Sequence, residues 1–263
     1  MADEAKLVLH CGARQVSRAD LEAIEAPSAT STWFPIAHRT VIDAVTGTLT
    51  SSGFVVKREQ FGLARNDARM FATLDLASEL APGVTLSVGV RNSTDKSFPL
   101  GFTAGSRVFV CDNLAFRSDI LVTRKHTRFG RQRFEGEIAR AVVTLGAFQK
   151  HEAERVLALQ RQEIPDERAE ALMLRAFEGG IVPHRALPAV IAEWRKPSFE
   201  EFRPRTGWSL LNAFTTALGK RAKSYPQEYA RTTMKLGAMV DLAVGLKPFV
   251  LPVEGEAVPA LAS

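Results

Sequence analysis

Apolar and polar residues alternate strictly in two segments of the N-terminal half of this chain. Apolar side chains occupy every even position from 70 to 76 and again from 84 to 90. Because successive side chains on a strand point to opposite faces, each segment is predicted to be a β-strand with one buried face. Weaker strand patterns occur at 54–63 and at about 107–111. The sequence therefore predicts a strand-rich region over 53–126.

Turn residues separate these strands. Asn66-Asp67 precedes the first alternating segment, Pro82-Gly83 lies between the two, and Ser93-Thr94-Asp95-Lys96 follows the second. Short connections of this kind favour antiparallel neighbours.

Apolar spacing becomes helical after residue 133, where Phe134, Ile138, Val142 and Leu145 lie on one helix face. An earlier helix is predicted over 38–52. Strands followed by helices indicate the α+β class, with an antiparallel sheet of about four to six strands in the N-terminal half and a helical C-terminal half. Further helices are predicted at 166–178, 187–195, 206–223 and 227–245.

Three regions follow from these patterns. Residues 1–37 contain the small polar run 26–32 and are expected to form a loosely ordered leader, whose Trp33 and Phe34 dock onto the domain. Residues 38–245 form a single α+β domain, strand-rich over 53–126 and helical over 134–245. Residues 246–263 contain three prolines and are expected to be a flexible tail.

Composition narrows the functional class only modestly. The 263 residues include 34 Lys and Arg against 29 Asp and Glu, so a basic protein of net charge +5 is compatible with polyanionic partners. The two cysteines, Cys11 and Cys111, lie far apart and fit a reducing compartment. No apolar run reaches the roughly 18 residues of a membrane-spanning helix. We therefore expect a cytoplasmic protein with no membrane association.

No catalytic signature occurs in the chain. Phosphate-binding and dinucleotide-binding glycine motifs, the zinc-protease motif and the nucleophile-elbow motif are all missing. The histidines and cysteines show no metal-site spacing beyond the adjacent His10-Cys11. The sequence favours a non-enzymatic function with no cofactor and no metal. One alternative is a metal-dependent nuclease built from Asp43, Asp75, Asp112 and Asp119.

Basic residues concentrate between residues 117 and 133, where only Asp119 is acidic and Phe129-Gly130 suggests a flexible loop. Local density of cations, rather than net charge, determines phosphate binding. A solvated face without a ligand is the alternative. The candidate nucleic-acid-binding residues in this segment are Arg117, Arg124, Lys125, Arg128, Arg131 and Arg133.

The polar faces of the strands supply a second candidate surface. If the registers align, one side of the sheet carries Arg69, Phe71, Arg91, Arg107 and Phe109. Single-stranded nucleic acid binds such mixtures because bases stack on rings and cations contact phosphates. In the alternative, the later helices cover this face and Phe71 and Phe109 are core residues.

A third group of cations lies between residues 195 and 235. Lys220 and Lys223 are three residues apart, and Arg231 and Lys235 are four apart, so each pair can share a helix face. Favourable placement of cations near a helix C-terminus explains Lys220 and Lys223 equally well. Residues 208–215 show a pattern that is typical of packing.

Four short motifs in this order resemble the phage/plasmid-like protein family, a family of unknown function found in phages, prophages and plasmids. They are Asn92-Ser93-Thr94-Asp95, Cys111-Asp112-Asn113, the basic stretch 123–127 and the Trp208 to Thr215 helix. Thr94 stands where the family often has His, so no imidazole role is carried over. The resemblance covers roughly residues 35–245 and implies a mobile-element origin and work on nucleic acid, with no established reaction.

These observations favour a non-enzymatic protein of a mobile element in a bacterial host cell. We expect it to bind nucleic acid, with single-stranded DNA favoured, in replication or recombination by binding or annealing strands. A homo-oligomer is expected by analogy with annealing proteins. The competing hypothesis is a module that binds a host or phage protein.

Overall fold

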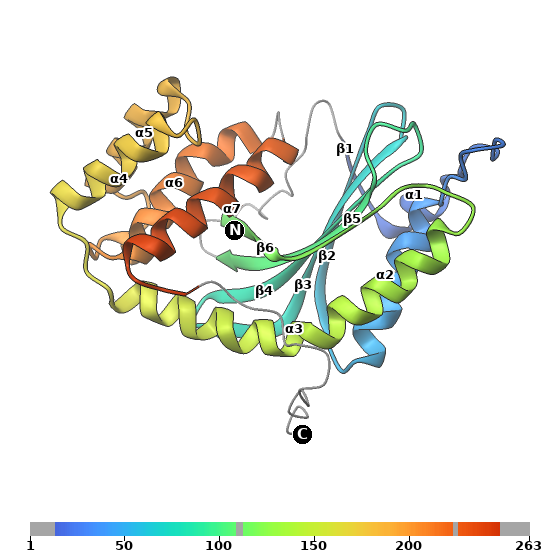
Figure 1. The fold of residues 1–263 in the computed structure, drawn as a ribbon, viewed down its shortest axis with the longest axis horizontal. Coiled ribbons are helices and arrows are strands. Elements are labelled where there is room, and N and C mark those ends of the chain that lie inside the picture. The colour runs from blue at the N-terminus through green and yellow to red at the C-terminus, as the bar shows by residue number, and fades with distance from the viewer. Residues whose placement is uncertain (1–13, 109–112, 223–225, 248–263) are drawn as a thin grey trace.

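The computed structural model describes residues 14–108, 113–222 and 226–247 (Figure 1). Side chains are described for these residues except 107, 108, 113–121, 220–222, 226–228 and 230. Six antiparallel strands form one sheet in which each strand pairs with the next along the chain. The strands are β1 (Arg14–Val16), β2 (Val56–Ala64), β3 (Arg69–Ala81), β4 (Val84–Ser93), β5 (Leu100–Val108) and β6 (Asn113–Arg124).

The two alternating segments form the central strands β3 and β4. Leu74 lies opposite Val88, and Ala72 lies opposite Val90, so the apolar positions share one buried face. The β3–β4 turn consists of Pro82 and Gly83, and Gly83 has a φ of 74°. A β-turn with Pro followed by a residue at positive φ favours Gly at that second position. The predicted strands and their short connection are therefore confirmed.

The helical half follows the sheet as the spacing predicts, and the α+β class is confirmed. Residues 38–51 also form a helix as predicted, and Gly53 adopts a φ of 84° just beyond it. The long helices are α2 (His38–Ser51), α3 (Gly130–Arg161), α4 (Asp166–Glu178), α5 (Leu187–Arg195), α6 (Gly207–Ala222) and α7 (Pro226–Ala243), with 3₁₀ turns at η1 (His184–Ala186) and η2 (Glu200–Phe202).

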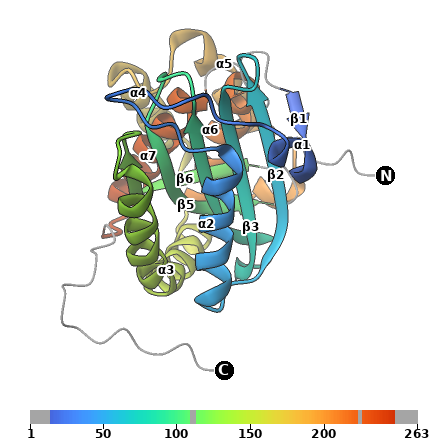
Figure 2. The same ribbon diagram turned by 90° about the vertical axis from the view of Figure 1, so that its right-hand side faces the viewer.

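Helices lie on both sides of the sheet. Helices α2 and α3 pack side by side against its apolar face, and α6 and α7 contact β6 from the other side (Figures 1 and 2). Phe134, Ile138 and Leu145 of α3 are fully buried, which is the face that helical spacing predicts. The apolar face of the sheet is thus enclosed by α2 and α3.

Two parts of the fold differ from the sequence-based expectation. Residues 14–22, expected to belong to a loose leader, form β1 and the short helix α1 (Arg18–Glu22). Val16 and Leu21 are buried, and Ser17 and Asp20 form a capping box. Residues 117–133 were expected to form a flexible loop, but 117–124 belong to edge strand β6 (Asn113–Arg124), and α3 begins at Gly130. The expected tail lies outside the described residues from 248 onward.

A buried ion cluster joins α3 to α7. The Arg155 guanidinium donates from Nε to both carboxylate oxygens of Asp241 at 2.8 Å, and from Nη1 to Glu152 at 2.9 Å. All three side chains are at most 7% exposed. Charges removed from water in this way need partners, so the cluster fixes the position of α7 relative to α3.

Candidate nucleic-acid interface

The polar face of the sheet is closed at its centre. Gln60, Thr73, Asp75 and Ser87 are each at most 6% exposed. Ser87 Oγ donates to Asp75 Oδ1 at 2.6 Å across the β3–β4 pair. The hypothesis of an open aromatic and cationic face is therefore wrong for the centre of the sheet.

One end of the same face remains partly open and carries two of the expected residues. Phe71 and Arg91 lie directly opposite each other on β3 and β4 and are both half-buried. The ring of Phe98 lies 5.3 Å from that of Phe71 and 5.6 Å from the Arg91 guanidinium carbon, measured to ring centroids. Arg91 lies across Gly101, where an added Cβ would be 2.8 Å from its Nε. The predicted combination of aromatic ring and cation is therefore present, but the surface that it forms is limited to this end of the face.

Several expected residues occupy known backbone positions without a described side chain. Arg107 lies in β5 opposite Thr85, Arg117 lies in β6, and Lys220 lies in α6. Phe109 and Lys223 lie outside the described residues.

The basic segment is a short loop between a strand and a helix rather than a long loop. Residues 125–129 connect β6 to α3. Two of its expected phosphate contacts are held by carboxylates instead: Arg124 Nη2 lies 2.6 Å from Glu137 Oε1, and Arg131 Nε lies 2.9 Å from Glu135 Oε1. The hydrogen bond from Arg124 also lowers the pKa of Glu137. These two arginines are largely neutralised.

The remaining cations of this segment are exposed and have no ion pair among the described residues. They are Lys125, Arg128 and Arg133. The Phe129 side chain is 56% exposed, and the Arg128 guanidinium lies 6.0 Å from its ring centroid. Arg133 lies one turn into α3, where its N–H donates to the Phe129 carbonyl. Three exposed cations without an ion pair among the described residues thus lie within four residues of one exposed ring in the sequence, and one of them, Arg128, lies over that ring.

Two further residues reach this loop from distant parts of the sequence. The Trp33 ring lies 6.4 Å from that of His126, and Lys96 Nζ lies 5.0 Å from the Trp33 ring centroid. Trp33 docks onto the domain as predicted. The sequence around Trp33 did not indicate that this side chain would lie beside the loop. Together, Trp33, Lys96, Lys125, Arg128, Phe129 and Arg133 form what we call the basic loop surface.

A buried polar cluster anchors Ile36 and His38, just after Trp33 in the chain. Asn92 Nδ2 donates to the Ile36 carbonyl at 2.8 Å and lies 2.9 Å from His38 Nδ1, while His38 Nε2 contacts the Asp67 carbonyl at 2.9 Å. The Ile36 N–H donates to His126 Nδ1 at 3.2 Å. These contacts assign both imidazoles a neutral form with the proton on Nε2. Burial lowers the pKa of each histidine.

The aspartates of the nuclease alternative do not come together where the structure describes them. Asp43 of α2 bonds to Arg18 Nη2 at 2.8 Å, whereas Asp75 bonds to Ser87 on the opposite face of the sheet. Asp119 has no described side chain, and Asp112 lies outside the described residues. No group of three or more His, Cys, Asp or Glu side chains in the described part of the chain is placed to hold a metal ion.

Comparisons add no further constraint on the function. Among the described residues, no helix combines the length and apolarity needed to cross a membrane. Comparison of the chain with protein-family models, with curated proteins and with solved structures found no match. The resemblance to the phage/plasmid-like family stays a sequence-based prediction.

Proposed function

We propose that this protein binds single-stranded nucleic acid, DNA in particular, through the basic loop surface. It acts without a bond-making step of its own, in replication or recombination of a mobile element in the bacterial cytoplasm. The observation that supports this function is the exposed ring of Phe129 beneath the Arg128 guanidinium, with the exposed Lys125 and Arg133 close by in the sequence. No carboxylate is paired to any of the three cations among the described residues.

Electrostatics favours a polyanion at this surface. Exposed cations that lack ion pairs release counterions when phosphates replace them, and this release provides most of the sequence-independent affinity for nucleic acid. Arg124 and Arg131 contribute less, because Glu137 and Glu135 already hold them.

Exposed rings favour a single strand over a duplex. The Phe129 ring is accessible for stacking, and Trp33 lies beside the same loop. Unpaired bases stack on such rings for about 1–3 kcal/mol each, whereas the bases of a duplex already stack on one another.

Fluorescence anisotropy with labelled single-stranded and duplex oligonucleotides tests this function. We expect tighter binding of the single strand, and we expect replacement of Phe129 by Ala to reduce that preference. Replacement of Leu174, an exposed apolar residue on α4, by Ala is the control and leaves the preference unchanged. Absence of binding to either oligonucleotide at low salt overturns the proposal and favours a protein-binding module.

A further inference from the structure

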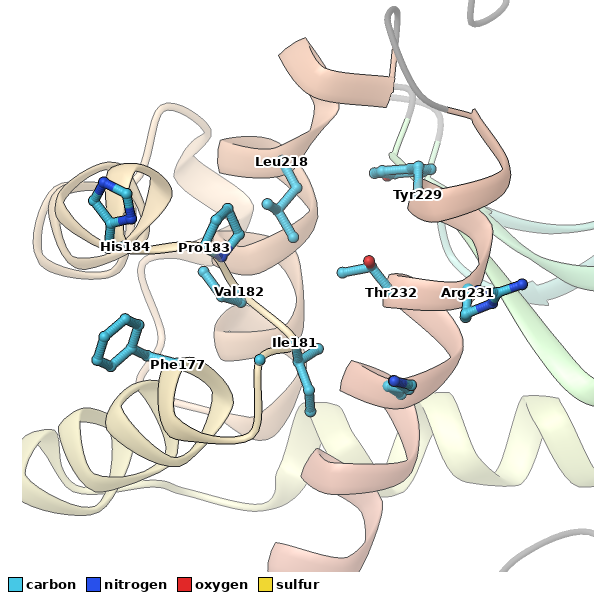
Figure 3. Close-up of a pocket in the computed structure, with 11 residues that line it drawn as sticks. Phe177, Ile181, Val182, Pro183, His184, Leu218, Tyr229, Arg231 and Thr232 are labelled. Atoms are coloured by element: carbon cyan, nitrogen blue, oxygen red, sulfur yellow. The ribbon is translucent and has the colours of Figure 1, made fainter.

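A cavity lies in the helical half of the molecule. It has a volume of about 490 Å³ and lies between α7 and the segment that leaves α4, with Leu218 of α6 between them (Figure 3). Small-molecule sites typically occupy about 300–1,000 Å³. The lining residues are Phe177, Gly180, Ile181, Val182, Pro183, His184, Leu218, Tyr229, Arg231, Thr232 and Lys235.

One wall of this cavity is cationic. Arg231 and Lys235 lie one turn apart on α7, both side chains are exposed, and neither has an ion pair in the described part of the chain. Arg231 extends from α7 toward the sheet (Figure 3). There it approaches Arg91, whose pKa is lowered mainly by burial and further by the positive charge of Arg231.

Three cations without a carboxylate partner repel one another. Lys235 lies one turn from Arg231 on α7, and the charge of Arg231 acts on the half-buried Arg91. An anion bound at Arg231 and Lys235 relieves this repulsion, and a phosphate group fits best because it accepts hydrogen bonds from both cations at once.

The opposite wall is flat and largely apolar. It contains the Phe177 ring, which is 40% exposed, together with Pro183 and the exposed imidazole of His184. Gly180, with a φ of 64°, lets the chain turn back at the end of α4. The N–H groups of Ile181 and Val182 both donate to the Ala176 carbonyl. Because these amides already have an acceptor, a ligand in the cavity is recognised by side chains.

We propose that this cavity binds a nucleoside phosphate, with the phosphate against Arg231 and Lys235 and the base against Phe177 and Pro183. The combination of a cationic wall and an aromatic wall within one small-molecule-sized cavity carries this inference. It is independent of the function proposed above, because the two sites share no residue.

Isothermal titration calorimetry of the full chain with adenosine monophosphate tests the site. Adenosine and inorganic phosphate, titrated separately, distinguish the contributions of base and phosphate. We expect adenosine monophosphate to bind at least tenfold more tightly than either fragment. Equal affinity for inorganic phosphate and adenosine monophosphate, or no heat at millimolar nucleotide, overturns the proposal.

Substitutions in the cavity test whether the nucleotide binds there. The Arg231→Ala, Lys235→Ala double variant is expected to weaken nucleotide binding at least tenfold. The single variant Lys235→Gln is expected to weaken it severalfold, and it keeps the test valid if the double variant unfolds. Lys150→Ala with Arg161→Ala, at two exposed positions of α3 outside both proposed sites, is the control with equal charge loss. Unchanged affinity in the cavity variants, or an equal loss in the control, rules out this site.

Discussion

At the scale of single residues, two buried histidines determine how residues 30–37 are held. Both accept a hydrogen bond at Nδ1, from Asn92 in the case of His38 and from the Ile36 N–H in the case of His126. A protonated imidazole carries a hydrogen on both nitrogens and cannot accept. Protonation of either ring therefore removes a contact of this cluster, either of the Ile36 N–H with His126 or of Asn92 with His38.

The stability of the fold is expected to fall as the medium becomes mildly acidic. Burial lowers the pKa of His38 and His126 below the ordinary 6.5, against the opposing effect of Asp67 and Asp95 on His38. Below pH 6.5 the unfolded chain thus binds more protons than the folded one. The stabilisation is complete above pH 6.5 and is lost as the pH falls through the folded pKa values.

Thermal unfolding between pH 8 and pH 5 measures this effect. The His38→Gln, His126→Gln variant is expected to show a smaller loss of melting temperature over this range than the unmodified chain. His184→Gln, which changes an exposed imidazole, is expected to keep the original pH dependence. Parallel pH profiles for all three proteins would contradict the assigned roles.

The count of charged residues along the sequence located the basic segment. It did not show which of its cations lack an ion pair among the described residues. The Arg131 pairing with Glu135 spans four residues on one helix and is visible in the sequence. The Arg124 pairing with Glu137 joins a strand to a helix, so it depends on how β6 leads into α3. Only the folded chain distinguishes Lys125, Arg128 and Arg133 from these neutralised neighbours.

At the scale of elements, the junction between the basic loop and α3 requires a glycine. A Cβ added at Gly130 would lie 2.7 Å from the Lys125 carbonyl oxygen, a backbone atom that cannot move independently. Gly130→Ala is expected to lower the free energy of unfolding by about 1–3 kcal/mol and to displace the loop.

Gly136, further along the same helix, is the matched control. A Cβ there meets nothing within 4 Å, so Gly136→Ala is expected to stabilise the chain by about 0.5–1 kcal/mol. Urea denaturation of both variants measures the difference. Equal effects at the two positions would show that the close approach at Gly130 is unimportant.

The ion cluster between α3 and α7 leads to a second prediction at this scale. Asp241→Ala leaves the buried charge of Arg155 with Glu152 alone and is expected to destabilise the fold by about 3–5 kcal/mol. Asp43→Ala removes a carboxylate that is 52% exposed and bonded to Arg18, and it is expected to cost about 1 kcal/mol or less. Chemical denaturation compares them, and similar losses would contradict a structural role for the cluster.

Elements with local periodicity were predictable, and elements that depend on distant pairing were not. Helices α4 to α7 and strands β3 and β4 have apolar positions at regular spacing, which the sequence displays directly. Strand β6 carries an irregularity, because Thr103 pairs with Leu121 while Gly105 pairs with Phe116. That interruption removes the alternation on which the prediction of a strand depends. The three-residue strand β1 is defined only by its pairing with β2.

At the scale of the whole molecule, the basic loop and α4 lie at opposite ends of α3 (Figure 1). Helix α3 contains 32 residues and is therefore about 48 Å long. The basic loop surface adjoins its first turn, and α4 follows its last (Figure 1). The sequence could not predict that Trp33, Lys96 and Phe129 belong to one surface, because nearly a hundred positions separate the first from the last and only the sheet and α2 bring them together.

The salt dependence of single-stranded oligonucleotide binding tests the central claim most directly. Each phosphate contact adds about 0.7 to the slope of log affinity against log salt for single strands. Replacing Lys125, Arg128 and Arg133 by Ala should therefore reduce that slope by about 2. Replacing Arg161 at the last residue of α3, Arg175 in α4 and Arg185 in η1, three exposed cations, by Ala removes equal charge and should leave the slope nearly unchanged. Equal slopes for the unmodified chain and the Lys125, Arg128, Arg133 variant would contradict binding at the basic loop surface.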